Sequence, residues 1–223
     1  MPTIAIIDFE TTGMSPDLGD RPTEVAIVLT ENGTVVDRFQ SLMNPGMYVS
    51  SFITQLTGIT NAMVKAAPPV AQVMADAARF VGHSPMVAHN ASFDRKFWQA
   101  ELRRLGQPAD HPFACTVLLA RRLLPQAPNH QLGTLAQFLR LPSTGRAHRA
   151  LADAEMTAEL LHHMHRVLQT QHGIPHPNHS LLMGLQTCTK ATVPAWLKRQ
   201  AAALGQPPTG VQSSTRQPSR SAT

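Results

Sequence analysis

The stretch Thr3-Ile4-Ala5-Ile6-Ile7-Asp8-Phe9-Glu10 decides the fold of this chain of 223 residues. Its apolar, β-branched residues follow one another without alternation, which is typical of a strand that is buried on both faces. We therefore expect a central strand over residues 3–9. Because every second side chain of a strand points to the same face, Asp8 and Glu10 present their carboxylates together at its end.

Hydrophobic patterning predicts further strands and helices around this strand. The pair Asn32-Gly33 is a strong signal for a hairpin between two of the strands. The further strands are predicted at residues 24–30, 35–43, 86–89 and 113–116. The helices are predicted at residues 69–81, 90–105, 117–124, 132–139 and 149–168, with Asn90 as the N-cap of the second. These elements define an α/β fold with a mixed five-stranded sheet flanked by helices.

The composition argues against a membrane protein and against a zinc site. Apolar residues make up 43% of the chain, but no apolar run approaches the roughly 20 residues that span a bilayer. The N-terminus has no basic stretch before an apolar core, so we expect no signal peptide and a cytoplasmic location. Only Cys115 and Cys188 are present, far apart and without neighbouring ligands at zinc spacing, which fits a reducing compartment.

The distribution of charge divides the chain into two parts. Residues 1–170 hold all 14 acidic residues and 14 basic ones, whereas residues 171–223 hold five basic residues and no acid. We interpret the first part as a catalytic domain and the second as a Pro-, Ser- and Gln-rich basic tail, largely irregular. A short helix is expected at 194–204. Its Trp196 and Leu197 need a covering surface, either on the domain itself or on a captured partner.

Two more carboxylates stand at the starts of predicted helices. Asp94 and Asp153 each fall within the first helical turn, where the helix dipole alone also favours an acid. With Asp8 and Glu10 they make four oxygen ligands at the ends of separate core elements, without thiols. Such a set suits Mg²⁺ or Mn²⁺ rather than zinc.

His148 precedes Asp153 by five residues. In one continuous helix this spacing separates two side chains by about 140° and about 7.5 Å, so they are poor candidates to bind one ion. We therefore assign Asp153 to the metal and place His148 on the loop before the helix, free to take a proton from an attacking water. An unperturbed pKa of about 6.5 suits that role.

Three sequence motifs carry these residues. They are Asp8-Phe9-Glu10-Thr11-Thr12-Gly13, His89-Asn90-Ala91-Ser92-Phe93-Asp94 and His148-Arg149-Ala150-Leu151-Ala152-Asp153-Ala154. In order and spacing they resemble the exonuclease motifs of the DEDDh family, which includes the proofreading epsilon subunit of bacterial DNA polymerase III. The resemblance covers residues 1–168. It implies a ribonuclease H-like fold and a two-metal mechanism that releases nucleoside 5′-monophosphates from 3′ ends.

The resemblance also implies roles for single residues in this exonuclease domain. His148 matches the general base of the family. The positions that match its metal ligands are Asp8, Glu10, Asp94 and Asp153.

Four further positions match places where family members contact the terminal nucleotide. Thr11 and Gly13 meet the nucleotide, Phe93 packs a ring on it, and Leu56 wedges between the terminal bases. Thr57 departs from the family, in which many proofreading members carry His. The departure puts the grip on the substrate at this position in question.

We predict a 3′–5′ exonuclease of the proofreading or repair type that acts on single-stranded DNA 3′ ends. An RNA 3′-end trimming exonuclease is the alternative within the same class, because recognition of the 2′-hydroxyl depends on details of the pocket. A non-catalytic module that binds a polymerase or a clamp is the alternative from a different class. A DNA polymerase subunit or a sliding clamp is the partner expected for the tail, and no membrane partner is expected.

Overall fold

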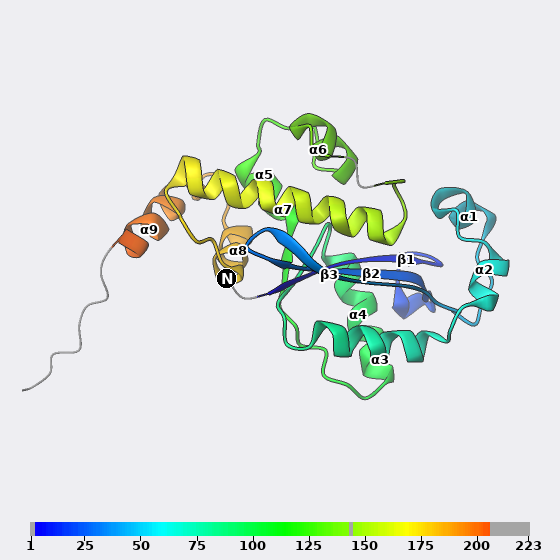
Figure 1. Cartoon of the computed structure of the whole chain (residues 1–223). Helices are drawn as coiled ribbons and strands as arrows, with labels where there is room; N and C mark the ends of the chain where they lie inside the picture. Colours follow the sequence, from blue (N-terminus) through cyan, green and yellow to red (C-terminus); the bar gives the residue numbers. More distant parts are fainter. Residues whose placement is uncertain (1–2, 143–144, 206–223) are drawn as a thin grey trace, which may run out of the picture.

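A mixed five-stranded sheet forms the centre of the protein, as the sequence predicts (Figure 1). The computed structural model describes residues 3–142 and 145–205. Its strands are β1 (Ile4–Thr11), β2 (Pro22–Glu31), β3 (Thr34–Leu42), β4 (Met86–Ala88) and β5 (Phe113–Cys115). Their order in the sheet is β3-β2-β1-β4-β5. Strand β2 is antiparallel to both β1 and β3, whereas β4 is parallel to both β1 and β5.

Helices cover both faces of the sheet. They are α1 (Ser51–Thr57), α2 (Asn61–Ala66), α3 (Val70–Val81), α4 (Ser92–Arg104), α5 (Thr116–Leu123), α6 (Leu132–Leu139) and α7 (Ala150–His172). Helices α5, α6 and α7 lie on one face and α3 and α4 on the other, while α1 and α2 stand near the end of β1 (Figure 1). No helix within the described ranges is long and apolar enough to cross a membrane.

The alternation of side chains along β1 divides the interior into two hydrophobic cores. Ile4 and Ile6 belong to the core beneath α5 and α7, whereas Ile7 belongs to the core beneath α3 and α4. Asp8 and Glu10 continue the row of Ile4 and Ile6, so they project toward α7. The buried strand that organises the fold thus also delivers two acids to one face of the sheet.

Two short helices and one helix cap differ from the prediction. Helices α1 and α2 are absent from the prediction because seven and six residues are too few to show helical periodicity. Their N-caps Ser50 and Thr60, whose side chains accept backbone N–H groups, are the signals that the sequence carries. Asn90 is not the N-cap of α4. It has a φ of 65°, a left-handed conformation that asparagine tolerates, and α4 begins after Ala91.

Helix α9 (Val193–Gly205) coincides with the short helix predicted in the tail. Leu197 on this helix is only 1% exposed and belongs to the core beneath α7, with Trp196 packed against the same core. Of the two surfaces considered for this helix, the domain itself is the one that covers it. Residues 206–223, the rest of the tail, lie outside the described residues.

Helix α8 (His179–Thr187) is not predicted from the sequence. Its N-cap is Asn178, whose side chain accepts the N–H of Leu181 at 2.9 Å. Gln186 on α8 accepts the N–H of Cys115 at 2.8 Å and donates to the carbonyl of Phe113 at 3.3 Å, so its amide covers the outer edge of β5.

Candidate active site

Three carboxylates meet where β1, β4 and α4 come together. Asp8 and Glu10 project from β1, and Asp94 lies in the first turn of α4, shortly after β4, the parallel neighbour of β1. Asp94 Oδ1 accepts the backbone N–H of Phe9 at 3.2 Å, and the side chain of Asp94 is almost fully buried. This hydrogen bond fixes the third carboxylate beside the strand that carries the other two.

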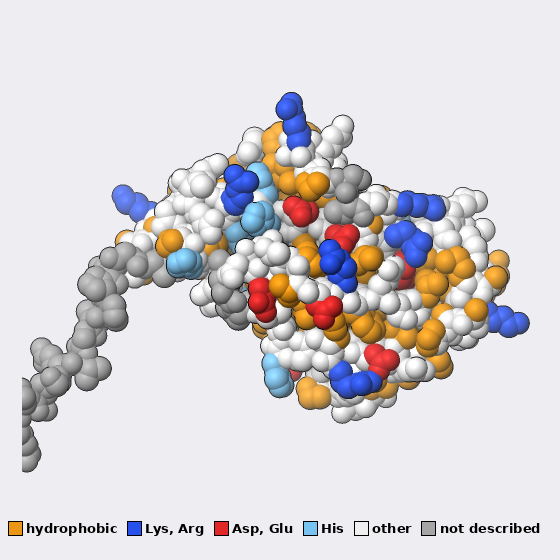
Figure 2. Space-filling view, viewed as in Figure 1, with side chains coloured by type: hydrophobic (Ala, Val, Ile, Leu, Met, Phe, Trp, Pro, Cys, Tyr) orange, Lys and Arg blue, Asp and Glu red, His pale blue; other side chains and the backbone are white. Residues whose placement is uncertain are grey.

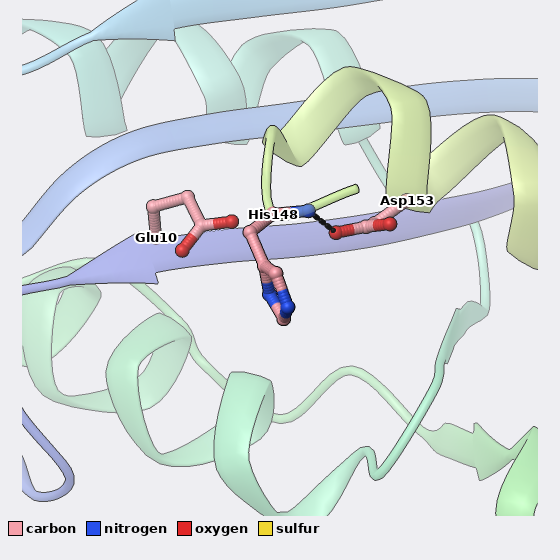
Figure 3. A group of neighbouring side chains, drawn as sticks. All are labelled: Glu10, His148 and Asp153. Carbon is pink, nitrogen blue, oxygen red and sulfur yellow. Dashed lines mark hydrogen bonds between the residues drawn. The ribbon is translucent and has the colours of Figure 1, made fainter. Parts of the chain in front are cut away.

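The loop before α7 brings His148 and Asp153 to the same place. His148 lies outside the helix, as the sequence predicts, with a φ of 58° and an exposed side chain. Its backbone N–H donates to Asp153 Oδ2 at 2.9 Å, which holds the loop to the first turn of α7. One potential ligand atom each from Glu10, His148 and Asp153 lie within 4.8 Å of one another (Figure 3).

Glu24, a buried residue of β2, anchors the start of α7. It accepts hydrogen bonds from Arg149 Nη2 at 2.8 Å, Arg149 Nε at 3.1 Å, the N–H of Ala150 at 3.1 Å and Gln40 Nε2 at 2.9 Å. Burial alone would raise the pKa of Glu24, but these hydrogen bonds lower it below its usual value. Glu24 therefore stays charged and joins the sheet to the helix that carries Asp153.

The clustered carboxyl groups disfavour one another's ionisation. Burial raises the pKa of Asp8 well above its usual value, and the carboxylates of Asp94, Asp153 and Glu10 raise it further. Burial and the neighbouring acids raise the pKa of Glu10 to about 8. Burial also raises the pKa of Asp94 to about 8, and it raises that of Asp153. Bound divalent cations would remove this repulsion, and the oxygen-rich donor set fits Mg²⁺ or Mn²⁺.

A hydrogen-bonded loop after β1 shapes one wall of the site. A Cβ at Gly13 would lie 2.3 Å from Asp20 Oδ1, so a larger residue at this position would displace the Asp20 side chain. The hydroxyl of Thr11 donates to the carbonyl of Gly13 at 2.5 Å, and Asp20 Oδ2 accepts the N–H of Ser15 at 3.0 Å. The loop is thus closed by its own polar groups.

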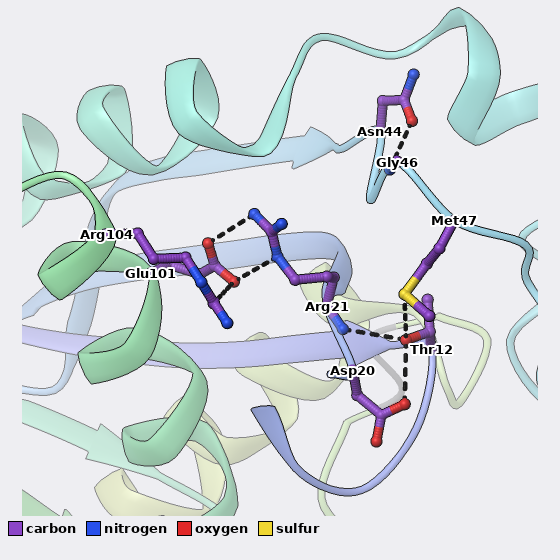
Figure 4. Close-up of polar contacts among 8 residues, drawn as sticks. All are labelled: Thr12, Asp20, Arg21, Asn44, Gly46, Met47, Glu101 and Arg104. Atoms are coloured by element: carbon purple, nitrogen blue, oxygen red, sulfur yellow. Dashed lines mark hydrogen bonds and ion pairs between the residues drawn. The ribbon is translucent and has the colours of Figure 1, made fainter. Parts of the chain in front are cut away.

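An ion pair with a buried glutamate ties this loop to α4 (Figure 4). Glu101 on α4 is 2% exposed and accepts hydrogen bonds from Arg21 Nε at 2.8 Å and Arg21 Nη2 at 2.9 Å. Arg104 donates to the same carboxylate at 2.6 Å. The pair between Arg21 and Glu101 is bidentate, and α4 also carries Asp94. It therefore fixes the loop after β1 relative to the Asp94 carboxylate.

One cleft of about 410 Å³ unites these groups. The residues predicted from the sequence that line it are Asp8, Glu10, Thr11, Gly13, Leu56, Phe93, Asp94, His148 and Asp153. Large apolar side chains also line it, among them Met14 at 74% exposed and Phe52 at 70% exposed. Figure 2 shows hydrophobic side chains at the end of the molecule that carries α1 and α2, and α1 contributes Phe52, Ile53 and Leu56 to the wall of this cleft.

Thr57, the departure from the family pattern, lines the same cleft but is only 1% exposed. Its hydroxyl donates to the carbonyl of Ile53 at 2.9 Å and accepts the N–H of Ile59 at 3.0 Å. The side chain therefore closes the C-terminal end of α1, and its single hydroxyl hydrogen is already engaged within the protein.

The residues that hold the site together are absent from the sequence prediction. Glu24 and Glu101 are acids in largely apolar surroundings, which is the one signal that the sequence offers for them. Their partners Arg149 and Arg21 lie 125 and 80 residues away along the chain, so no local spacing rule connects them. His89 lines the cleft but is also absent from the predicted site residues. Burial lowers the pKa of its ring to about 4, so the ring is neutral.

The five-stranded sheet has helices on both faces, and carboxylates converge at the end of its central strand. This combination defines a ribonuclease H-like nuclease fold. The chain belongs to the exonuclease family described as RNase_T, whose model matches residues 5–161.

Relatives of this chain include a DNA polymerase and an exonuclease. The chain is 43% identical over 160 residues to DNA polymerase III PolC-type of Oceanobacillus iheyensis, an alignment covering 71% of this chain and 11% of the relative. It is 36% identical over 173 residues to 3′-5′ exonuclease DinG of Bacillus subtilis, covering 77% of this chain and 18% of the relative. The chain thus spans less than a fifth of the length of either relative.

Solved structures of exonucleases share the fold. Exonuclease X in complex with 5′ overhanging duplex DNA superposes with a TM-score of 0.65 at 28% identity, covering 82% of this chain and 99% of that one. Exonuclease I superposes with a TM-score of 0.66 at 21% identity, covering 82% of this chain and 46% of that one.

Proposed function

We propose that this exonuclease removes nucleotides from the 3′ ends of DNA in a proofreading or repair role, by a two-metal mechanism. The observation that carries the proposal is the convergence of four carboxyl groups of raised pKa, from β1, α4 and α7, in one cleft. The similarity to DNA polymerases of the PolC type, and the DNA bound to Exonuclease X, support DNA as the substrate.

In this proposal Asp8, Glu10, Asp94 and Asp153 hold two cations, Mg²⁺ or Mn²⁺. When bound, the cations supply electrostatic stabilisation of the charge that develops on the attacked phosphate. His148 takes the proton from the attacking water, and the exposed position of its ring beside Glu10 and Asp153 suits it for that transfer. The products are a nucleoside 5′-monophosphate and a strand shorter by one nucleotide.

The terminal nucleotide occupies the part of the cleft lined by Thr11, Gly13, Leu56 and Phe93. The ring of Phe93 packs on that of Phe97, with ring centroids 5.1 Å apart, so it offers a fixed apolar surface to the nucleotide. Leu56 is 39% exposed on α1 and is available to contact a base.

The partners and location rest on the relatives. A DNA polymerase is the partner class that we propose, because polymerases of the PolC type carry the similar segment. We also propose a cytoplasmic location and a role in DNA replication, because these relatives are DNA polymerases. A sliding clamp is the second partner class, bound through the basic tail over residues 171–223, of which residues 206–223 lie outside the described residues.

Digestion of matched 3′-labelled and 5′-labelled single-stranded DNA and RNA tests the proposal. We expect stepwise loss from the 3′ end with Mg²⁺ or Mn²⁺, no reaction with EDTA, and a preference for DNA. Asp8→Asn should abolish turnover, and Asp110→Asn, which removes an exposed acid from the loop before β5, should not. A preference for RNA would promote the trimming alternative, and full activity of Asp8→Asn would refute the metal assignment.

A further inference from the structure

A second groove, of about 1020 Å³, opens from the same acidic cluster. We call it the α5–α6 groove, and away from the cluster its lining includes Arg121, Asn129, His130, Gln131 and Gln137. It shares only Asp8, His89, His148 and Asp153 with the cleft described above. The acidic cluster therefore lies at the junction of two hollows that extend over different elements.

A strand being cut must place one nucleotide on each side of the attacked phosphate. The proposed function puts the terminal nucleotide in the cleft, beside Leu56 and Phe93, and neither of these residues lines the α5–α6 groove. The rest of the strand has to leave the cluster by another opening. The α5–α6 groove begins at Asp8, His148 and Asp153, so it is continuous with the attacked bond.

The lining of the α5–α6 groove matches the chemistry of a nucleic acid strand. Arg121, exposed on α5, has no ion-pair partner within the described ranges, and apart from the shared Asp8 and Asp153 the groove is lined by no acid. Amide and hydroxyl groups surround it, including Gln131 and Gln137. The cleft, by contrast, is lined by no Lys or Arg among the described residues. A free cation among neutral polar groups suits a phosphate.

Hydrogen bonds within the protein hold the wall of the groove in place. His89, directly after β4, bonds through Nε2 to the carbonyl of His130 at 3.1 Å and through Nδ1 to the hydroxyl of Thr116 at 2.9 Å. A carbonyl can only accept, so Nε2 carries the hydrogen. Asn129 Oδ1 accepts the N–H of Gln131 at 3.0 Å, which braces the same loop. The loop is thereby tied to the strand end that leads to the acidic cluster.

We propose that the α5–α6 groove binds the nucleotides on the 5′ side of the attacked bond, with Arg121 on a backbone phosphate. This inference rests on the proposed function and adds a second substrate subsite to it. It predicts that the enzyme distinguishes a strand from a single nucleotide ester, because only the strand reaches Arg121.

Two substrates separate the subsites. One is an oligothymidylate of about ten nucleotides, and the other is the p-nitrophenyl ester of thymidine 5′-monophosphate, which has a phenol in place of the strand. Arg121→Ala should lower kcat/KM for the oligonucleotide about tenfold, mainly through KM, and leave hydrolysis of the ester unchanged. The slope of log KM against log salt should fall by about 0.7 with the lost phosphate contact.

Arg79→Ala is the matched control, since it removes one exposed positive charge from α3, on the other face of the sheet. This variant should leave kcat/KM unchanged for both substrates. Equal losses on both substrates in Arg121→Ala, or no loss on the oligonucleotide, would overturn the groove assignment while leaving the proposed function intact. If the unmodified enzyme hydrolyses neither substrate, the proposed function fails and the groove assignment fails with it.

Discussion

Glu24 does not line the cleft, yet its carboxylate holds the start of α7, next to His148. Replacing Glu24 with Gln keeps the shape of the side chain and removes the charge that faces Arg149. We expect the free energy of unfolding to fall by about 1–3 kcal/mol, because a buried and hydrogen-bonded pair loses one charge. We also expect kcat to fall while KM stays near its original value, since the substrate subsites are untouched.

Urea denaturation measures the free energy of unfolding of Glu24→Gln, and steady-state kinetics measure its kcat and KM. Glu31→Gln is the control, because Glu31 is an exposed acid on the same strand. A less stable Glu24→Gln protein with an unchanged kcat would show that Glu24 serves the fold alone and does not position the site.

His148 gives a second test, because its ring lies close enough to Glu10 and Asp153 to be either a base or a ligand. If it acts as the base, His148→Gln should lower kcat by about 10²–10⁴-fold and leave the affinity for Mn²⁺ within about twofold of the original. Isothermal titration of Mn²⁺ into the variant provides the second quantity. A large loss of affinity would instead make His148 a ligand.

The residues of the site divide into those that sequence motifs reveal and those that only folding reveals. Asp8 and Glu10 are two residues apart on a buried strand, and Asp94 begins a helix, so their positions follow from local periodicity. Glu24 and Arg149 meet across 125 residues of chain, and their pairing depends on how α7 crosses β2. Such a contact has no local signature, so the sequence alone does not predict it.

The acidic cluster joins β1, α4 and α7, so its protonation affects how firmly these elements hold together. Unfolding returns Glu10 and Asp94 to their usual pKa values of 4.5 and 3.8, from about 8 in the metal-free folded protein. Between these pH values the folded state binds more protons than the unfolded state. The free energy of unfolding of the metal-free protein should therefore fall as the pH rises from about 4 to about 8.

Added Mg²⁺ should counter this loss, because it replaces the protons that the carboxylates give up. At a free concentration about 100 times its Kd, Mg²⁺ should raise Tm by about 5–10 °C at pH 8 and by clearly less at pH 5. Thermal denaturation with and without EDTA, at constant ionic strength, measures this difference. Equal stabilisation at both pH values would contradict binding at the acidic cluster.

Most elements of the fold are predictable from the sequence, but α1, α2 and α8 are not. The strand pattern around Asn32-Gly33 and the spacing of apolar residues in α3 give elements close to those observed. Helices α1 and α2 have seven and six residues, which is too few for periodicity to distinguish them from loops. Helix α8 has nine residues, but it lies in the segment whose composition predicts an irregular tail. Helices α1 and α8 also depend on tertiary contacts, since α1 forms a wall of the cleft and α8 covers the edge of β5.

The protein as a whole raises the question of where its folding unit ends. The sequence predicts an exonuclease domain over residues 1–170, and the family match ends at residue 161. Two apolar residues of α8, Leu182 and Leu185, and Leu197 of α9 are nevertheless buried in the same core as α7. The boundary at residue 170 stays a prediction, and the packing suggests how to test it.

Shortening the chain after His172 removes α8 and α9 and uncovers both the core beneath α7 and the outer edge of β5. We expect the shortened protein to lose its cooperative thermal transition, because the loss of several buried leucines approaches the roughly 5–15 kcal/mol that stabilises a typical domain. In the full chain Leu182→Ala should cost about 2–5 kcal/mol, whereas Leu18→Ala, at a side chain 83% exposed, should stay within about 0.5 kcal/mol. Circular dichroism during heating and urea denaturation measure these effects. A shortened protein with an unchanged Tm would establish the first 172 residues as an independent domain, and α8 and α9 as helices that merely rest on it.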